Sequence, residues 1–313
     1  MPDTYLVTGA AGFIGSNLVE RLLADGERVV GLDSLVTGKR ENIEPFAADI
    51  DFIEGDIRDP ATCARACESA DHVLHQAALG SVPRSVDDPA TSNEHNVTGT
   101  LNMLVAARDA GARRFVYAAS SSAYGDTEVL PKREQMCPAP LSPYAVSKYT
   151  GELYCKVFYE LYGLPTVCLR YFNVFGRRQD PEGMYAAVIP RFARAILRGE
   201  RPVIFGDGGQ TRDFCHVDNA VEANLLACRA GEAAFGESMN IAGGERITIQ
   251  RLAERMIELL GGETSPEHGP ERPGEPRDSL AALDRAAELI GYRPGVDVHT
   301  GLERAVEWYR ENL

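Results

Sequence analysis

The stretch that decides the fold is Thr8-Gly9-Ala10-Ala11-Gly12-Phe13-Ile14-Gly15, which directly follows an apolar run at residues 5–7. Within it, Gly9 permits a tight turn from strand to helix, Gly12 lets the backbone approach a pyrophosphate, and Gly15 lets the helix pack closely on the strand. The amides at the N-terminus of that helix would attract the two phosphates of a dinucleotide. Because any tight turn of this kind can carry three glycines, the interpretation depends on the residues that follow.

A carboxylate at the end of the second strand-like run indicates which dinucleotide is bound. Residues 28–33 end in Asp33, whose side chain can accept both hydroxyls of the adenosine ribose. The same charge would repel a 2′-phosphate, so the expected cofactor is NAD. Lys39 and Arg40 follow at a distance and keep NADP open as the alternative. After the third run, residues 55–59 are expected to hold the adenine, although a helix cap would have the same composition.

Short apolar runs alternate with amphipathic helical patterns through the first 180 residues. The strand-like runs are residues 5–8, 28–33, 51–54, 72–76, 115–119 and 166–171. This alternation predicts an α/β fold with a Rossmann-type, doubly wound parallel sheet covered by helices on both faces. We expect an NAD-binding Rossmann domain at residues 1–180, to which some later segments return. Residues 181–313, with frequent glycine and proline between short helices, are expected to form a smaller C-terminal α/β substrate-binding region.

Composition limits the classes of partner. The formal net charge of -14 would repel nucleic acid and an anionic membrane surface, so we expect neither as a partner. Neither a secretory signal nor a membrane-spanning run precedes the first strand, which favours a cytoplasmic location. The seven cysteines are scattered and are expected to be reduced thiols. Cys63 and Cys67 have no further His or Cys pair nearby, so we expect no metal site.

A tyrosine and a lysine four residues apart carry the predicted chemistry. Tyr144 and Lys148 lie near the start of a predicted helix, so both side chains project from one face and can act together. Tyrosine ordinarily titrates near pH 10, so a base at pH 7 needs roughly 4 kcal/mol of anion stabilisation, which an adjacent ammonium and a positive nicotinamide ring can supply. An amphipathic helix alone gives the same spacing. The glycine motif and the serine run at residues 120–122 favour the catalytic interpretation.

These motifs together make the sequence similar to the extended short-chain dehydrogenase/reductase family and, within its NAD-dependent epimerases and dehydratases, to the nucleotide-sugar 4-epimerases. The resemblance covers nearly the whole chain. Besides residues 8–15 and 142–148, it rests on residues 117–125, 169–176, 211–218 and 272–275. The members most like this sequence act on UDP-N-acetylglucosamine and UDP-glucose.

The resemblance implies a redox reaction that is reversed within one catalytic cycle. Tyr144 would take the proton of the sugar 4-hydroxyl while a hydride passes from C4 to tightly held NAD. The resulting 4-keto sugar would turn in the site and take the hydride back on its other face. Lys148 would stabilise the Tyr144 phenolate, and Ser120 would hydrogen-bond the reacting oxygen. Ser121 or Ser122 could share that task, and a role for all three serines in a simple turn stays open.

The resemblance also assigns binding residues. Those expected at the cofactor are Gly9, Gly12, Phe13, Ile14, Gly15, Asp33, Asp56, Ile57, Gln76, Ala77, Ala78, Tyr144, Lys148 and Tyr171. Those expected at the substrate are Gly80, Ser81, Ser121, Ser122, Asn173, Gln179, Ala187, Val188, Arg212, Arg272 and Ser279. Among the latter, Asn173 and the two arginines would bind the pyrophosphate, since a guanidinium meets phosphate oxygens two at a time. Residues 187–190 resemble the segment that lies along uracil, which favours UDP.

Two features point to a 2-acetamido sugar. Residues 78–85 resemble the group of epimerases that act on UDP-N-acetylglucosamine, and the position that is bulky in glucose-restricted relatives is Ser279 here. The smaller side chain would leave room for the acetamido group. The resulting prediction is a UDP-sugar 4-epimerase that interconverts UDP-GlcNAc and UDP-GalNAc, and also UDP-Glc and UDP-Gal. An ordinary loop role for Ser279 stays open.

Three rival functions remain as alternatives. A nucleotide-sugar 4,6-dehydratase normally carries an Asp-Glu pair where this chain has Ser121 and Ser122, which argues against dehydration. Epimerisation of UDP-glucuronate stays open. A non-catalytic NAD-binding regulator is the remote alternative, because such proteins commonly lose the tyrosine and lysine that are present here. The resemblance further implies a homodimer, formed through helices near residues 93–110 and 144–162.

Overall fold

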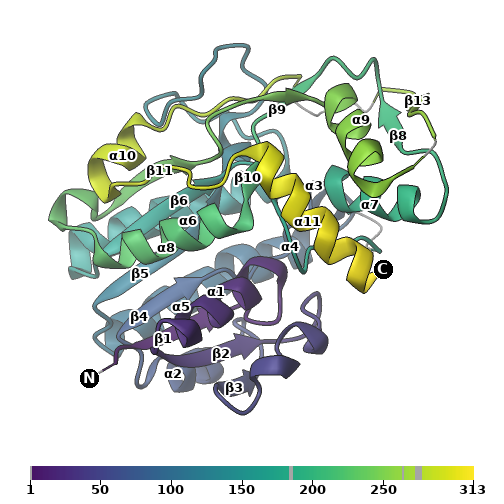
Figure 1. The fold of residues 1–313 in the computed structure, drawn as a ribbon. Coiled ribbons are helices and arrows are strands. Elements are labelled where there is room, and N and C mark those ends of the chain that lie inside the picture. Colours follow the sequence, from purple (N-terminus) through teal and green to yellow (C-terminus); the bar gives the residue numbers. More distant parts are fainter. Residues whose placement is uncertain (1, 183–185, 263, 272–276) are drawn as a thin grey trace.

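The computed structural model describes residues 2–182, 186–262, 264–271 and 277–313. Its centre is a seven-stranded parallel sheet with the strand order β11-β6-β5-β4-β1-β2-β3 (Figure 1). The strands are β1 Thr4–Thr8, β2 Arg28–Asp33, β3 Asp51–Glu54, β4 His72–His75, β5 Arg114–Ser120, β6 Thr166–Tyr171 and β11 Glu237–Ile241. The predicted α/β fold with a doubly wound parallel sheet is confirmed. The seventh strand, β11, comes from the C-terminal half of the chain.

The order of the strands fixes where a ligand can bind. β1 lies between β2 and β4, so the chain continues to one side of β1 with β2 and β3 and to the other with β4, β5 and β6. At such a switch point the loops leave the carboxyl ends of neighbouring strands in opposite directions and open a crevice. The glycine turn that follows β1 and the loop that follows β4 therefore face the same crevice.

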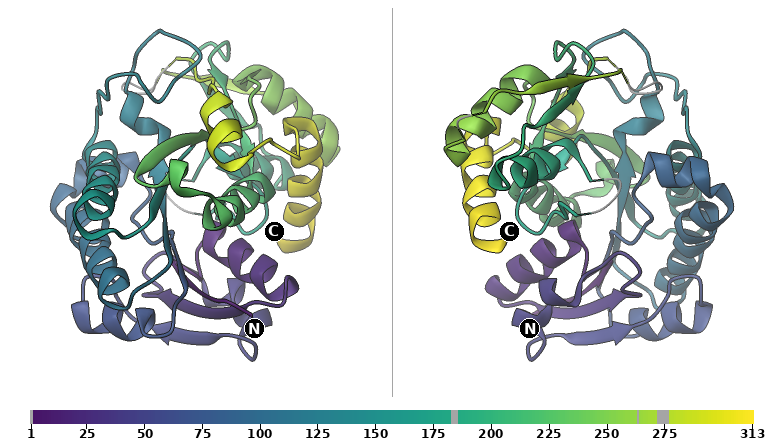
Figure 2. Two further views of the ribbon diagram at one scale, coloured as in Figure 1. Left: turned by 90° about the vertical axis from the view of Figure 1, so that its left-hand side faces the viewer. Right: turned by 90° about the vertical axis from the view of Figure 1, so that its right-hand side faces the viewer.

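Helices cover both faces of the sheet, as the two views of Figure 2 show. On one face, α1 (Phe13–Ala24), α8 (Val217–Arg229) and α10 (Asp284–Ile290) pack on a core that includes Leu18 and Leu225. On the other, α2 (Pro60–Cys67), α5 (Gly99–Asp109) and α6 (Pro143–Tyr162) pack on a core that includes Met103 and Phe158. Both faces are buried, which explains why the strands read as nearly continuous apolar runs.

Local signals set the ends of α6, the longest of the described helices. Ser142 caps its first turn by accepting a hydrogen bond from the Ala145 amide at 3.2 Å, and Pro143 occupies the first helical position, where no amide is needed. The helix ends at Gly163, whose φ of 69° is the left-handed conformation that stops a helix. These signals hold Tyr144 in the first turn.

A second layer of structure lies above the carboxyl edge of the sheet. Its helices α7 (Val188–Leu197), α9 (Ile249–Leu260) and α11 (Val298–Asn312) surround a separate core that includes Phe192 and Leu252. Short strands pair beside them: β7 Val174–Phe175 with β10 Cys215–His216, β8 Val203–Phe205 with β13 Glu267–Gly269, and β9 Thr211–Arg212 with β12 Ile247–Thr248. The short helices α3 (Val82–Asp87) and α4 (Pro89–Asn93) and the π-helical turn Glu94–Thr98 lead into α5. The remaining short helical turns are Arg40–Asn42, Glu44–Phe46, Ser121–Tyr124 and Glu232–Ala234.

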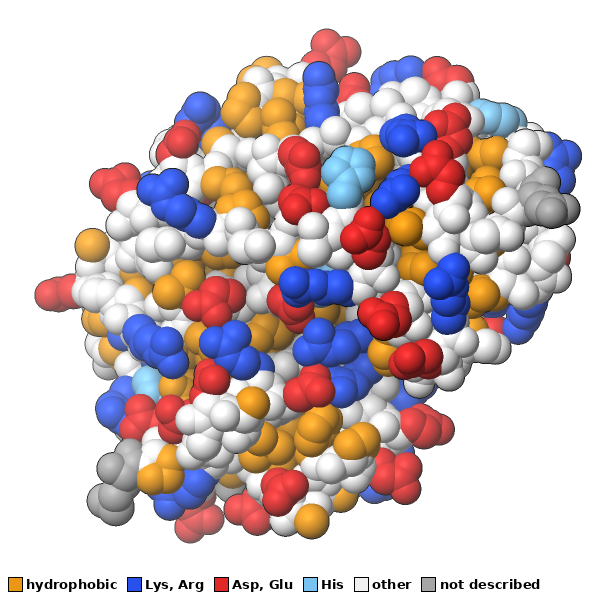
Figure 3. Space-filling model, viewed as in Figure 1, with side chains coloured by type: hydrophobic (Ala, Val, Ile, Leu, Met, Phe, Trp, Pro, Cys, Tyr) orange, Lys and Arg blue, Asp and Glu red, His pale blue; other side chains and the backbone are white. Residues whose placement is uncertain are grey.

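The surface carries charges of both signs. On the face drawn in Figure 3, acidic and basic side chains lie interspersed over the helices. Within the described ranges, no helix has the length and apolarity that a membrane crossing requires, and no group of three or more metal-ligating side chains comes together. All seven cysteines have free thiols, and only Cys137 among them is exposed.

Candidate active site

A cavity of about 790 Å³ lies at the carboxyl edge of the sheet, under the second layer. Except for Val188, every predicted site residue that the structure describes lines this cavity. They are Gly9, Gly12, Phe13, Ile14, Gly15, Asp33, Asp56, Ile57, Gln76, Ala77, Ala78, Gly80, Ser81, Ser120, Ser121, Ser122, Tyr144, Lys148, Tyr171, Asn173, Gln179, Ala187, Arg212 and Ser279. The structure therefore brings together residues that are up to 270 positions apart in the chain, from Gly9 to Ser279.

The glycine turn forms one end of the cavity and leaves no room for side chains. Gly9 has φ 68°, and a Cβ on Gly15 would lie 2.0 Å from the Gly9 carbonyl oxygen. A Cβ on Gly9 would approach the Ala77 backbone to 3.0 Å. Gly12 occupies the N-cap position of α1, and no described side chain accepts a hydrogen bond from the free amides of the first turn. Its backbone amides therefore form an anion-binding cradle at the cavity wall.

Asp33 stands beside this cradle at the end of β2. It is buried and accepts hydrogen bonds from the amides of Ala11 at 2.9 Å and Leu35 at 2.8 Å. Burial raises the pKa of its carboxyl group, and these amides act in the opposite direction. The amides of Gly12 and Ser34 also act on this carboxylate, which lines the cavity as an acceptor to which a ribose diol can donate. Lys39 is paired with Asp180 at 2.8 Å, so its charge is matched by an acid.

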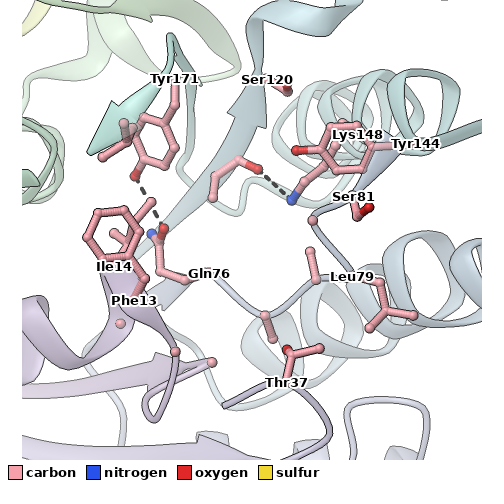
Figure 4. Close-up of a pocket in the computed structure, with 18 of the residues that line it drawn as sticks. Phe13, Ile14, Thr37, Gln76, Leu79, Ser81, Ser120, Tyr144, Lys148 and Tyr171 are labelled. Atoms are coloured by element: carbon pink, nitrogen blue, oxygen red, sulfur yellow. Dashed lines mark hydrogen bonds between the residues drawn. The ribbon is translucent and has the colours of Figure 1, made fainter. Parts of the chain in front are cut away.

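A three-residue hydrogen-bonded cluster closes the side of the cavity next to the glycine turn. The Tyr171 hydroxyl donates to Gln76 Oε1 at 3.4 Å (Figure 4). Asn224 of α8 contacts both partners. Asn224 donates to the Tyr171 oxygen at 2.7 Å and accepts from Gln76 Nε2 at 3.0 Å. The sequence predicted Gln76 and Tyr171 as cofactor residues. Asn224, which fixes them, follows a helical pattern and gave no separate signal.

Tyr144 and Lys148 lie side by side on α6, and their side chains point into the cavity (Figure 4). Lys148 is 4 % exposed, and its Nζ donates to the Ala118 carbonyl oxygen at 2.8 Å. Burial lowers the pKa of Lys148 to about 8, so the group is still mainly an ammonium at pH 7. Burial raises the pKa of Tyr144 above its usual value, and the hydrogen bond with Ser120 lowers it. A phenolate at neutral pH therefore needs positive charge beside it.

Hydrogen bonds within the serine run after β5 distinguish the roles of Ser120 and Ser122, which the sequence alone did not. Ser122 donates to Ser120 Oγ twice, from its hydroxyl at 2.8 Å and from its amide at 3.2 Å. The hydroxyl hydrogen of Ser120 is thus available for another acceptor, and its neighbour in the cavity is Tyr144. Ser122 orients Ser120, and Ser120 is the serine whose hydroxyl lowers the pKa of Tyr144.

Residues from three distant segments form the opposite end of the cavity. Asn173 has φ 34° and donates to the Asp213 carbonyl oxygen at 2.8 Å and to Ser279 Oγ at 3.3 Å. The Ser279 hydroxyl also accepts from the Asp213 amide at 3.2 Å. The buried Asp213 carboxylate in turn accepts from the amides of Gly243, Gly244 and Ala281. Asp213 therefore holds the loop that carries Ser279, a role that sequence reasoning missed although it lies in a quoted motif.

The remaining predicted substrate residues occupy different surroundings. Gln179 donates to the Val174 carbonyl oxygen at 3.0 Å, while its buried Oε1 accepts no hydrogen bond from the described residues. Arg212 donates to the carbonyl oxygens of Thr211 and Arg277, each at 2.9 Å. Val188 begins α7 and packs against the core of the second layer instead of the cavity. Arg272 lies outside the described residues.

Several cavity residues had no distinguishing sequence signal. Thr37 lies in the loop that follows β2 (Figure 4). Lys132 is a buried lysine in a long connection. Arg178 follows the motif at residues 169–176 and donates to the Ser16 carbonyl oxygen at 3.3 Å. Each was brought to the cavity by tertiary packing, so spacing along the chain could not identify it.

The sequence of this chain matches a known protein family over most of its length. Residues 5–242 match the model of the NAD dependent epimerase/dehydratase family. The chain belongs to this family. NAD is its cofactor, as the sequence motifs predicted, and the predicted family membership is confirmed.

This epimerase/dehydratase family member has similar relatives along its full length. A UDP-glucose 4-epimerase from Mycolicibacterium smegmatis is 41% identical over 309 residues, covering 97% of this chain and 98% of the relative. The structure of a UDP-N-acetylglucosamine 4-epimerase from Methanobrevibacter ruminantium, in complex with UDP-N-acetylmuramic acid, is 39% identical, with a TM-score of 0.95 and full coverage of both chains. The Thermus thermophilus UDP-glucose 4-epimerase in complex with NAD is 38% identical, with a TM-score of 0.90, covering 99% of this chain and 100% of the relative.

The residues of this chain fit NAD. The tight turn that a Cβ on Gly15 would disrupt leaves the amides at the start of α1 facing the cavity, where they can bind the pyrophosphate. Asp33 can accept the adenosine ribose hydroxyls. Arg40 is paired with Glu54 and Lys39 with Asp180, so both basic side chains that left NADP open have acidic partners. The arrangement favours a ribose without a 2′-phosphate.

Proposed function

We propose that this chain is a UDP-sugar 4-epimerase that interconverts UDP-GlcNAc and UDP-GalNAc, and also UDP-Glc and UDP-Gal. The observation that carries the proposal is the residue set around Tyr144. The hydroxyls of Ser120, Ser121 and Ser122 line the cavity there, where a dehydratase would carry its acid and base.

The acids of the cavity support this assignment because each one already has partners. Among the described lining residues the acids are Asp33, Asp56, Asp180 and Asp278. Asp33 accepts backbone amides, Asp56 pairs with Arg58 at 2.7 Å, and Asp180 pairs with Lys39. Asp278 accepts from the Thr211 amide at 3.0 Å and from its hydroxyl. None of these four described acids is bonded to Tyr144, Lys148 or Ser120, which agrees with a site that has no acid and base for dehydration beside the tyrosine.

The proposed mechanism follows from the pair on α6. NAD, which the glycine turn and Asp33 would hold, would supply the hydride acceptor for C4 and the hydride donor for the return step. Tyr144, as a phenolate, takes the proton of the 4-hydroxyl and returns it to O4 after the sugar has turned. The Lys148 ammonium stabilises the phenolate, and Ser120 donates its free hydrogen to the reacting oxygen. The cycle is redox-neutral, so no external reductant is consumed.

The far end of the cavity supports a UDP-sugar. Asn173, Arg212, Gln179 and Ala187 line this end of the cavity. Gln179 Oε1 accepts no hydrogen bond from the described residues, so it can accept one from a nucleoside diphosphate. Ser279 is small, so it leaves space for a 2-acetamido group. The proposal of an acetamido sugar is also supported by the 39% identical relative named as a UDP-N-acetylglucosamine 4-epimerase. We also propose that residues 1–180 bind mainly the cofactor and residues 181–313 mainly the nucleotide sugar.

One observation favours a second candidate, epimerisation of UDP-glucuronate. Lys132 is buried, lines the same cavity, and donates from Nζ to the Thr127 carbonyl oxygen. A cation at the sugar end would suit a C6 carboxylate. The test is to incubate the enzyme with UDP-GlcNAc, UDP-glucose and UDP-glucuronate separately and to compare kcat/KM. The proposal expects the first to react fastest, and faster reaction of the uronate would replace it with the second candidate.

We further propose that two copies associate through α6. Val146, Leu153, Val157 and Leu161 are 50, 47, 41 and 70 % exposed and recur at helical spacing, which forms an apolar stripe on the outer face of the helix. A stripe of this kind on a helix marks a protein interface. Light scattering should give the mass of two chains for the wild type and of one chain for Val157→Glu. A monomeric wild type would refute the dimer.

A further inference from the structure

A buried histidine that the proposed chemistry does not use lies between the two halves of the site. His75 is the last residue of β4 and is fully buried. Its Nδ1 is 2.8 Å from Thr8 Oγ1, at the end of β1, and its Nε2 is 3.0 Å from Thr100 Oγ1, on α5. The ring therefore connects β1, which leads into the glycine turn, to helix α5.

The hydrogen-bond partners of Thr100 and Thr8 determine which ring nitrogen of His75 carries the hydrogen. The Thr100 hydroxyl donates to the Asn96 carbonyl oxygen at 2.7 Å, so it can only accept from His75 Nε2–H. In the neutral ring Nδ1 is then the acceptor, and it takes the hydroxyl hydrogen of Thr8. The Thr8 oxygen in turn accepts from the Ala77 amide at 3.1 Å. Burial lowers the pKa of His75 to about 3, in agreement with a neutral ring.

The connection continues from Asn96 to the helix that carries Tyr144. Asn96 holds Leu79 through both backbone groups, accepting from its amide at 2.8 Å and donating to its carbonyl oxygen at 3.2 Å. Asn96 also donates to Ser147 Oγ at 3.1 Å, and Ser147 donates to the Tyr144 carbonyl oxygen at 2.8 Å. The segment from Ala77 to Leu79, which lines the cofactor cavity, is thus held by hydrogen bonds to Thr8 at one end and to Asn96 at the other.

We propose that His75 is a positioning residue that holds the glycine turn, the 77–79 segment and the first turn of α6 in register. It acts as a neutral ring with one donor and one acceptor, which matches Thr100 on one side and Thr8 on the other. A ring with two N–H groups would leave the Thr8 hydroxyl without its acceptor, so the network requires this tautomer. The effect on cofactor binding rests on the NAD cavity, and the effect on turnover rests on the proposed function.

The test compares three variants in the full-length enzyme. His75→Leu removes both hydrogen bonds, while His75→Gln keeps an amide donor near the position of Nε2. Phe115→Leu is the matched control, because the Phe115 ring lies 5.5 Å from the His75 ring, is fully buried, and takes no part in the hydrogen-bonded chain. For each protein we would measure the NAD dissociation constant by calorimetry, kcat and KM for the UDP-sugar, and the urea midpoint of unfolding.

The proposal expects His75→Leu to weaken NAD binding and to lower kcat, each by about tenfold, because unpaired buried groups let the segment shift. KM for the UDP-sugar should stay within about twofold, since the far end of the cavity is not bonded to this chain of contacts. His75→Gln should recover most of both losses. Phe115→Leu should lower the urea midpoint without changing either quantity.

Two results would overturn the proposal. One is that His75→Leu and Phe115→Leu lose NAD affinity in proportion to their loss of stability, and the other is that His75→Gln performs no better than His75→Leu. If His75→Leu does not fold, Thr100→Val removes the same Nε2 contact with nearly equal volume and is judged by the same criteria. A wild type that binds NAD but turns over no sugar would refute the proposed function, while the NAD measurements would still decide the role of His75.

Discussion

The cofactor end and the sugar end of the cavity are built in different ways. At the cofactor end, residues within one strand-turn-helix unit meet, and Gly9 and Gly15 touch backbone to backbone. At the sugar end, Asn173, Asp213 and Ser279 come from three segments more than 30 residues apart and meet only through hydrogen bonds. The glycine turn is set by steric exclusion, with hydrogen bonds among Gln76, Tyr171 and Asn224 closing the wall beside it, whereas the sugar end is set by hydrogen bonds. A substitution in the tightly packed glycine turn should therefore abolish most cofactor affinity. A substitution in the hydrogen-bonded sugar end should instead change substrate preference.

The largest effect is expected where the two ends meet, at Tyr144. Tyr144→Phe removes the group that carries the proton, so kcat should fall by about 10³-fold or more. Binding of NAD and of the UDP-sugar should stay near the wild type, since the ring remains. Steady-state kinetics and calorimetry on the same preparation check both parts. A variant that kept more than a tenth of the wild-type kcat would remove Tyr144 from the chemistry.

The next effect tests steric exclusion at the cofactor end. Gly15→Ala places a Cβ 2.0 Å from the Gly9 carbonyl oxygen, so the turn must open and NAD affinity should fall by about 100-fold. Gly231→Ala is the control, because its Cβ would meet nothing within 4 Å. Calorimetric titration with NAD measures both. Equal affinities for the two variants would show that the turn is not sterically closed.

A smaller effect tests whether the sugar end can be retuned. Ser279→Tyr fills the space assigned to the acetamido group and should lower kcat/KM for UDP-GlcNAc relative to UDP-glucose by about 10- to 100-fold. NAD affinity should be unchanged. The matched control is Ser279→Ala, which removes the hydroxyl without adding bulk and should leave the ratio of the two substrates nearly unchanged. If tyrosine leaves the ratio unchanged, Ser279 does not face the 2-substituent.

The smallest effect concerns the pH dependence of stability through His75. Burial, with the nearby Lys148 charge, lowers the pKa of His75 from 6.5 to about 3 in the folded chain. Below pH 6.5 the unfolded chain therefore binds a proton that the folded chain does not, so this group's contribution to stability is lost as pH falls. Between pH 7.5 and 5.5 the wild type should lose about 1.4 kcal/mol more than His75→Gln in urea unfolding. Equal losses would show that His75 is protonated in the folded protein.

The same contrast explains what the sequence could predict. The turn at Gly9 and the acid at Asp33 lie at fixed spacings within one unit of local structure, so pattern and spacing identified them. Tyr144 and Lys148 share one helix face, and six of the seven sheet strands appeared as apolar runs. Asp213, Asn224 and His75 could not be identified in this way, because their roles depend on partners that only the tertiary fold brings close. The internal order of the serine run likewise needed the hydrogen bonds of Ser122 to Ser120.

The central claim is a reversible oxidation at C4, and isotope retention tests it most directly. The purified enzyme is incubated with UDP-GlcNAc in D₂O without added reductant, and proton NMR follows both C4 epimers. The account predicts that UDP-GalNAc forms and that both epimers keep protium at C4, because the hydride leaves and returns without contacting solvent. Deuterium at C4 would indicate proton abstraction from carbon, and the absence of inversion with any UDP-hexose would refute the epimerase assignment.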